Sequence, residues 1–174
     1  MNDPCHGNPP HDRDDGGARL AAGARHVELD LEHFLPYRLS VLSNRVSDSI
    51  FRMYSERFAL GVTEWRVMAV VGRYPDLSAG EVAQRTAMDK VAVSRAVARL
   101  VEAGRLQREV HGDDRRRSVL RLSEDGCRVY DQIAPLAIEF EQRLLKGMDA
   151  SERGLLFRLL DRLDELELQV EVGR

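Results

Sequence analysis

Residues 89–104, DKVAVSRAVARLVEAG, decide the fold of this chain. Asp89 is a good N-cap residue and Gly104 is typical of the position just after a helix, so the stretch predicts one helix from residue 90 to about residue 103. Its apolar residues recur at spacings of three and four, which places them on one face that should point into a core. These residues are Val93, Ala96, Val97 and Leu100.

The opposite face of this helix is small, polar and basic. It carries Lys90, Val91, Ser94, Arg95, Ala98 and Arg99. No bulky side chain prevents close approach, so the face suits insertion into a DNA major groove about 12 Å wide. We expect Arg95 to bond a guanine edge and Ser94 to reach a base or a phosphate. Lys90 and Arg99 would meet phosphates. The alternative is an ordinary solvated helix face with unremarkable charges.

A short helix precedes this one. Ser78-Ala79-Gly80-Glu81 has the S-x-x-E spacing of a capping box, in which the Ser and Glu side chains bond each other's backbone N–H groups. The helix should end near Thr86, just before Asp89. Two short helices joined by so tight a turn form a helix-turn-helix outline.

Two strands and a charged loop follow. Residues 106–110 and 118–122 alternate apolar and polar side chains, which is the period of a half-buried strand. In the loop between them Arg115, Arg116 and Arg117 repel one another, and a phosphate backbone or a narrow minor groove would relieve that repulsion. Asp114 can pair with Arg116 and hold its guanidinium in one pose. The alternative is a charged turn that keeps the hairpin soluble.

Helices are also predicted before the helix-turn-helix. Residues 31–58 carry one apolar stripe, and Pro36 fits only in the first turn of that helix. Gly61 should end it. Thr63 is predicted to cap the next helix, which contains Trp65.

Two more helices should follow the strands. Ser123 is predicted to cap a long helix that Pro135 should kink. Ser151 is predicted to cap a last helix that reaches Val170. The apolar stripes of the first and last helices exceed what a small winged domain can cover. We therefore expect a homodimer.

These elements predict a mainly α fold with a small β-wing. Residues 1–30 should form a disordered acidic tail, because they are rich in Gly, Pro, Asp and Asn and cannot recover the entropy of ordering. Residues 31–60 should form an N-terminal dimerisation helix and residues 61–122 a winged helix-turn-helix domain that binds DNA. Residues 123–174 should form C-terminal dimerisation helices.

The distribution of charge favours a nucleic-acid partner, although the total does not. The net charge of the 174 residues is −3, which taken whole argues against DNA binding. Divided by position, residues 85–122 carry ten basic and five acidic groups, a net charge of +5. The flanks are acidic, with −3 over residues 1–30 and −5 over residues 123–174. A basic island between acidic segments marks one face as the candidate for DNA contact.

From about Phe34 to Leu145 the chain resembles the MarR family of bacterial transcriptional regulators. The family's wing signature, D-x-R-x5-L-T, reads here Asp114-x-Arg116-x5-Leu122-Ser123, and Ser in place of Thr keeps the capping hydroxyl. Residues 77–83 resemble the first helix of the family's DNA-binding unit. Residues 93–104 resemble its recognition helix and the glycine that ends it.

The resemblance implies a winged helix-turn-helix dimer with interlocked terminal helices, bound to a pseudo-palindromic double-stranded DNA operator. Arg116 would be the wing arginine in the minor groove, Asp114 its orienting partner, and Ser94 and Arg95 contacts of the recognition helix. A two-fold dimer would place its recognition helices about 34 Å apart, one turn of DNA. The expected function is that of a repressor in the cytoplasm.

Many members of the family release DNA when a small aromatic acid or its coenzyme A thioester binds between the dimer helices and the winged domain. The candidate lining residues here are His33, Tyr37, Arg38 and Trp65. An arginine beside aromatic rings can hold a carboxylate while the rings stack on the ligand. Alternatively, Trp65 is a core residue, Tyr37 a dimer contact and Arg38 one half of an ion pair.

Other function classes find less support. A redox sensor needs an activated thiolate, and Glu124 and Asp125 oppose activation of Cys127. The His and Cys residues are too scattered for a zinc site, and no cofactor is expected. No phosphate loop or hydrolase motif occurs, and His111 sits on an open hairpin, so we expect no enzyme. No stretch predicts a secretory signal or a membrane span. A ligand-independent architectural DNA-binding protein stays open as an alternative.

Overall fold

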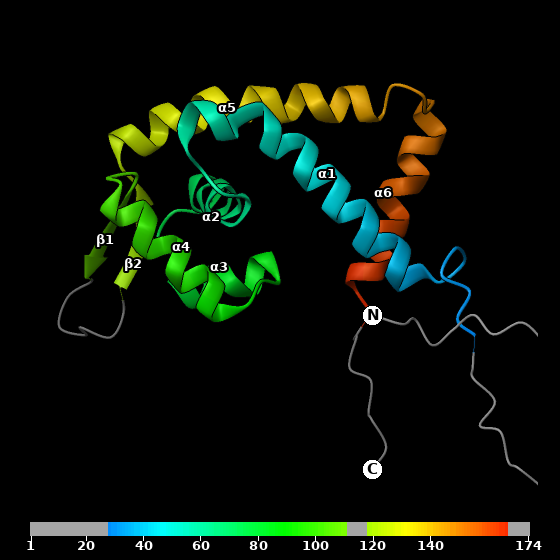
Figure 1. Cartoon of the computed structure of the whole chain (residues 1–174), viewed down its shortest axis with the longest axis horizontal. Coiled ribbons are helices and arrows are strands. Elements are labelled where there is room, and N and C mark those ends of the chain that lie inside the picture. Colours follow the sequence, from blue (N-terminus) through cyan, green and yellow to red (C-terminus); the bar gives the residue numbers. More distant parts are fainter. Residues whose placement is uncertain (1–27, 111–117, 167–174) are drawn as a thin grey trace, which may run out of the picture.

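The computed structural model describes residues 28–110 and 118–166. Its elements follow in the order α1 Leu35–Phe58, α2 Val62–Arg73, α3 Ala79–Thr86, α4 Lys90–Glu102, β1 Leu106–Val110, β2 Ser118–Leu122, α5 Glu124–Leu144 and α6 Ala150–Asp164. The predicted mainly α fold with a two-stranded wing is confirmed. In Figure 1, α5 runs along the top, α1 crosses below it, and α2, α3 and α4 cluster beneath them beside the two strands.

The core lies between α2, α4 and the strands, and it reaches α1 and α5. All four apolar residues predicted to face inward from α4 are buried. Around them pack the buried side chains of α2, the strands and the end of α1, including Met68, Leu120 and Tyr54. Burial of this set holds the helix-turn-helix and the wing together as one packed body.

A third strand segment, which the periodicity did not reveal, extends the wing. β1 and β2 pair antiparallel, with Leu106 opposite Leu122 and Val110 opposite Ser118. Leu77 also forms an isolated antiparallel bridge to Leu120, and the Leu120 amide donates to the Leu77 carbonyl at 2.8 Å. A single bridged residue shows no alternation of apolar and polar side chains, so the sequence predicted only the two strands. The bridge ties the base of the wing to the start of α3.

The outer helices bury much less. α6 has no buried residue, and Figure 1 shows it leaving the far end of α5, away from the winged domain. The apolar side chains exposed here lie on the first half of α1, on the end of α5 and on α6. They include Leu35, Leu39, Leu42, Ile138, Leu144, Leu155, Phe157, Leu159 and Leu160.

The helix starts correct several sequence predictions. α1 begins at Leu35 rather than near residue 31, with Pro36 in its first turn as predicted. Gly61, not Thr63, is the N-cap of α2, because the Glu64 carboxylate accepts the Gly61 N–H. Asp149, not Ser151, caps α6, where it exchanges hydrogen bonds with Glu152. The predicted caps Ser78, Asp89 and Ser123 are confirmed.

α5 runs from Glu124 to Leu144 as one helix with Pro135 inside it. α6 ends at Asp164, and Val170, the predicted end of the last helix, lies outside the described residues. Most of the predicted acidic tail lies outside them as well. Across residues 28–110 and 118–166, no helix is both long and apolar enough to cross a bilayer.

Candidate nucleic-acid interface

The outward face of α4 is open along its whole length. Lys90, Val91, Ser94, Arg95 and Ala98 are all exposed, as is Arg99. Asp89 fixes the start of the helix by accepting the N–H groups of Val91 and Ala92 at 2.9 and 3.0 Å. Within the described residues, neither Lys90 nor Arg95 forms an ion pair. Their charges are therefore available to a partner outside the chain.

Arg99, in contrast, already has an ionic partner. Its Nε donates to the Oε1 atom of Glu64 on α2. The same carboxylate accepts the Gly61 N–H through Oε2, so one glutamate caps α2 and holds an arginine of α4. Sequence reasoning assigned Arg99 to a phosphate and missed Glu64. The capping-box spacing to Gly61 was the available signal, but nothing local indicated the link to α4.

The base of the wing is held by ion pairs. Arg121 on β2 donates Nε to Asp76 and places Nη1 3.1 Å from the Oε2 atom of Glu109 on β1. Asp76 has φ of 68°, a left-handed conformation that turns the chain between α2 and α3. The predicted wing residues Asp114, Arg115, Arg116 and Arg117 lie outside the described residues, as does His111.

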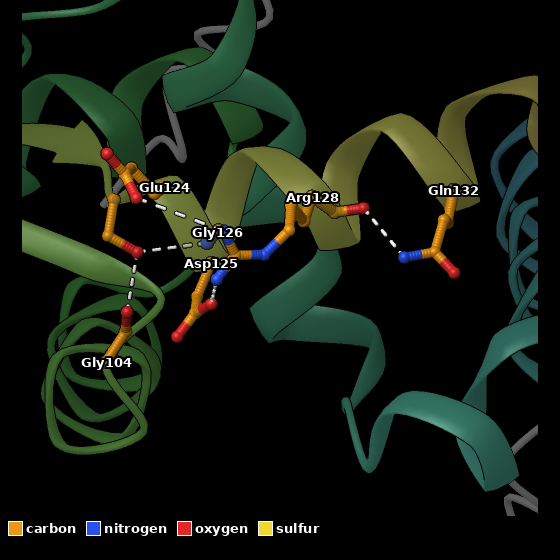
Figure 2. A network of polar contacts seen from close by, with 7 residues as sticks. Gly104, Glu124, Asp125, Gly126, Arg128 and Gln132 are labelled. Atoms are coloured by element: carbon orange, nitrogen blue, oxygen red, sulfur yellow. Dashed lines mark hydrogen bonds and ion pairs between the residues drawn. The ribbon is translucent and has the colours of Figure 1, made fainter.

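Ser123 joins the end of α4 to the start of α5. Its hydroxyl donates to the Gly104 carbonyl at 2.6 Å and accepts the Gly126 N–H at 2.9 Å (Figure 2). Gly126 lies so close to the backbone that a Cβ there would be 2.0 Å from the Arg105 carbonyl oxygen. This junction fixes α5 against the winged domain.

Beyond Ser123, side-chain contacts line the first turns of α5. Figure 2 shows Arg128 reaching back toward Asp125 and Glu124, and the Gln132 amide donating to the Arg128 carbonyl at 3.0 Å. Pairs at i, i+3 and i, i+4 support an exposed helix by a few tenths of a kcal/mol each. Cys127 is exposed on the same turns of α5.

A row of aromatic rings joins α1, α2 and α5. Phe51, Tyr54, Trp65 and Tyr130 follow one another with each neighbouring pair of ring centroids 5.8 Å apart. Beside this row lies a cavity of about 270 Å³. Its lining residues are Ser43, Val46, Ser47, Ile50, Tyr54, Val62, Trp65 and Arg66. The cavity is thus mostly apolar and has one guanidinium in its wall.

Arg66 is held in that wall by a hydrogen bond from Nη2 to the Ser47 hydroxyl at 2.6 Å. Burial raises the pKa of Tyr54 to about 12, with a smaller opposing effect from Arg66, so its phenol is neutral at physiological pH. Sequence reasoning missed Arg66 and Ser47. They are 19 residues apart on different helices, so no local spacing relates them.

The structure does not bring the four predicted ligand residues together within one chain. Trp65 lines the 270 Å³ cavity. Tyr37 and Arg38 line a separate hollow of about 690 Å³ along the first half of α1. His33 is exposed, and its Nδ1 lies 2.8 Å from the Oδ2 atom of Asp30. Trp65 also touches the core, as the alternative interpretation proposed. Among the described residues, no group of three or more His, Cys, Asp or Glu side chains is placed to hold a metal ion.

The helix-turn-helix, the paired wing and the long flanking helices define a winged helix-turn-helix protein. A sequence model of the MarR family matches residues 60–117. The HTH-type transcriptional regulator BilQ of Clostridium symbiosum is 28% identical over 93 residues, which are 53% of this chain and 65% of that protein. Residues 60–117 therefore match the MarR family of transcriptional regulators, and the chain shares its fold with a MarR/EmrR family regulator of known structure.

Solved structures extend this likeness beyond the winged domain. A MarR/EmrR family regulator from Acinetobacter sp. ADP1 superposes with a TM-score of 0.73 at 29% identity, covering 78% of this chain and 96% of that one. The PcaV regulator of Streptomyces coelicolor, solved in complex with its natural ligand, shares the fold with a TM-score of 0.68 at 22% identity. That match covers 80% of this chain and 98% of PcaV.

Proposed function

We propose that this protein is a DNA-binding repressor that reads a pseudo-palindromic operator in the cytoplasm. The outward face of α4 carries the proposal, because Arg95 and Lys90 project from a rigid helix and have no ionic partner among the described residues. Ser94 and Arg95 would contact base edges, and Lys90 and Arg99 phosphates. The wing residues Asp114, Arg115, Arg116 and Arg117 would reach the adjacent minor groove.

The DNA proposal is tested with fragments that the wild-type protein selects from a random duplex library. Arg95→Ala should relax the base preference, and Arg116→Ala should weaken binding about five- to 150-fold, equivalent to about 1–3 kcal/mol. Arg143→Ala removes an exposed arginine of α5 that pairs with Glu139 and serves as the control. Unchanged selected sequences for Arg95→Ala would show that α4 does not read bases. Unchanged affinity for Arg116→Ala at low salt would refute the wing contact.

We propose that two copies form the DNA-binding unit. α6 buries no residue within one chain, while Leu155, Phe157, Leu159 and Leu160 are all exposed on it. An exposed apolar surface of this kind is costly unless a partner covers it. Leu155→Glu should shift the mass in solution from dimer to monomer and weaken operator binding, whereas Glu152→Gln on the same helix should do neither. A wild-type monomer at micromolar concentration would refute this arrangement.

We propose further that a small aromatic acid or its thioester releases the operator. The cavity beside Trp65 supports this, because it combines aromatic walls with the guanidinium of Arg66. At about 270 Å³ it is slightly smaller than the roughly 300–1,000 Å³ typical of ligand pockets, which suits a single ring. The hydroxyl of Ser47 already orients Arg66. A carboxylate could replace that contact with two parallel hydrogen bonds.

Thermal shift and operator release with benzoate, 4-hydroxybenzoate and benzoyl-CoA test the effector proposal, since a ligand that binds the folded state raises its apparent stability. Arg66→Ala should abolish the response to an active compound. Arg38→Ala tests the ligand site predicted from the sequence, which also includes His33 and Tyr37. Loss of the response in Arg38→Ala would place the effector site on the first half of α1 instead. No response to any compound would favour the architectural alternative. Release by peroxide that Cys127→Ser abolishes would favour redox sensing.

A further inference from the structure

We propose that Glu64 is a positioning residue that sets Arg99 in one pose for a DNA phosphate at the C-terminal end of α4. The inference rests on the proposed DNA-binding function and adds to it a residue on α2, outside the helix-turn-helix. Glu64 lies on the helix next to Trp65 and Arg66, whereas Arg99 lies on the outward face of α4. Their side chains meet through the Nε–Oε1 ion pair.

The two members of the pair differ in exposure and in their contacts with the backbone. The Glu64 side chain is 12% exposed, and its second oxygen is fixed by the Gly61 N–H at the start of α2. The Arg99 side chain is 59% exposed. A carboxylate held by the backbone is therefore the fixed member, and the arginine is the member that it orients.

The ion pair uses one edge of the guanidinium and leaves another available. Only Nε of Arg99 takes part in the contact with Glu64, and its two Nη groups form no hydrogen bond or ion pair with the described residues. A guanidinium is planar and rigid, so fixing one edge fixes the direction of the other. The open edge matches the fork that binds phosphate oxygens through two hydrogen bonds. Glu64 and Arg99 also line a hollow of about 290 Å³, so the ion pair is accessible from that hollow.

The position of Arg99 on α4 suits a backbone contact better than a base contact. Lys90 and Arg99 lie at the two ends of the exposed face, about 14 Å apart along the helix axis. The major groove is about 12 Å wide. When α4 enters the groove, its ends reach the two flanking phosphate backbones. Lys90 is a flexible point charge for one backbone, and Arg99 is an oriented fork for the other.

A double-mutant cycle on full-length protein tests the proposal. The variants are Glu64→Gln, Arg99→Ala and the double variant. Anisotropy with a wild-type-selected duplex is recorded over a series of salt concentrations. Arg99→Ala should weaken binding about five- to tenfold and reduce the slope of log affinity against log salt by about 1. Glu64→Gln keeps an oxygen for the Gly61 N–H but loses the charge. It should weaken binding about three- to tenfold when Arg99 is present and less than twofold when it is absent.

The Glu139–Arg143 pair on α5 provides the matched control. It is also a Glu–Arg ion pair, but it is exposed and remote from α4. Glu139→Gln and Arg143→Ala should leave affinity and salt slope unchanged. Thermal unfolding of all variants checks that the fold is retained, and the salt slope reports a phosphate contact that a purely structural role would not alter.

Each other result overturns the inference. Tighter binding by Glu64→Gln would show that the carboxylate competes with phosphate for Arg99. An equal loss with and without Arg99 would make Glu64 a structural residue of α2 alone. An unchanged salt slope for Arg99→Ala would show that Arg99 does not contact a phosphate. The proposed function would still stand if the wild-type protein selects specific duplexes and Arg95→Ala relaxes that selection. If the wild-type protein selects no duplex at all, the proposed function fails and this inference fails with it.

Discussion

The winged domain, residues 60–122, and the helical arms, which are residues 35–46 and α6, bury their apolar side chains to opposite degrees. In the winged domain the inward faces of α2, α3 and α4 are buried against one another and the strands. In the arms, leucines at the same helical spacing stay exposed, and α6 buries none. One periodic pattern therefore serves two purposes. It packs the interior of one chain in the winged domain, and in the arms it presents the exposed surface that we propose a second copy covers.

A pair of leucine truncations tests this contrast with the largest expected effect. Leu100 is 1% exposed and Leu155 is 50% exposed. Leu100→Ala should lower the free energy of unfolding by about 2–5 kcal/mol, because it leaves a cavity in the core. Leu155→Ala should change the stability of dilute protein by less than about 0.5 kcal/mol. Urea denaturation at low protein concentration measures both, and equal losses would mean that a single chain covers its own arms.

A second test concerns the junction between the two regions. Gly126→Ala should destabilise the protein by about 1–3 kcal/mol, because the added Cβ would overlap the Arg105 carbonyl oxygen. Gly147, between α5 and α6, has open space around the position of a Cβ and provides the control. Thermal melts of Gly126→Ala and Gly147→Ala should separate clearly. Similar melting temperatures would mean that the junction relaxes without cost.

A third pair of variants compares Ser123, a confirmed N-cap, with Ser151, which was wrongly predicted to cap α6. Ser123→Ala removes the hydroxyl that bonds Gly104 and Gly126, and should cost about 1 kcal/mol, within the roughly 0.5–2 kcal/mol range for helix caps. Ser151→Ala should cost much less, because Asp149 caps α6 instead. Denaturant midpoints report the difference. A larger loss for Ser151→Ala would restore the original cap assignment.

The last expected effect has no influence at neutral pH: it is a pH dependence, confined to alkaline pH, that arises where the winged domain meets α1. Burial raises the pKa of Tyr54 from about 10 to about 12, so the unfolded chain loses this proton first as the pH rises. The stabilising contribution is complete below pH 10 and is lost between about pH 10 and pH 12. Unfolding free energies of wild type should therefore fall more steeply above pH 10 than those of Tyr54→Phe. Parallel profiles would mean that Tyr54 ionises equally in both states.

Sequence reasoning worked where the determining interactions are local. Both strands and the N-caps Ser78, Asp89 and Ser123 follow from neighbouring residues, and the structure confirms them. Two other caps were wrong, although Gly61–Glu64 and Asp149–Glu152 both have capping-box spacing. In those cases the glutamate three residues later was a better guide than the nearest hydroxyl.

The exposed face of α4 could be predicted from the sequence, but the side-chain contacts that join different helices could not. A single helical period sorts the inward face of α4 from the outward one, and the burial of Val93 and the exposure of Arg95 agree with that division. The contacts of Arg66 with Ser47 and of Arg99 with Glu64 join residues far apart in the chain. They depend on how α1, α2 and α4 pack, which no periodicity encodes.

The bridge between Leu77 and Leu120 affects the entropy of DNA binding. A hairpin attached only at its base would move independently of α4, and ordering it on DNA would cost conformational entropy in addition to that of the docking helix. Here the Leu120 amide bonds the Leu77 carbonyl, and the Asp76 amide bonds the Leu120 carbonyl, so the base of the wing and the start of α3 form one rigid unit. Much of that ordering cost is met when the chain folds. In the proposed complex with DNA, the affinity for two neighbouring grooves can then rest on few contacts.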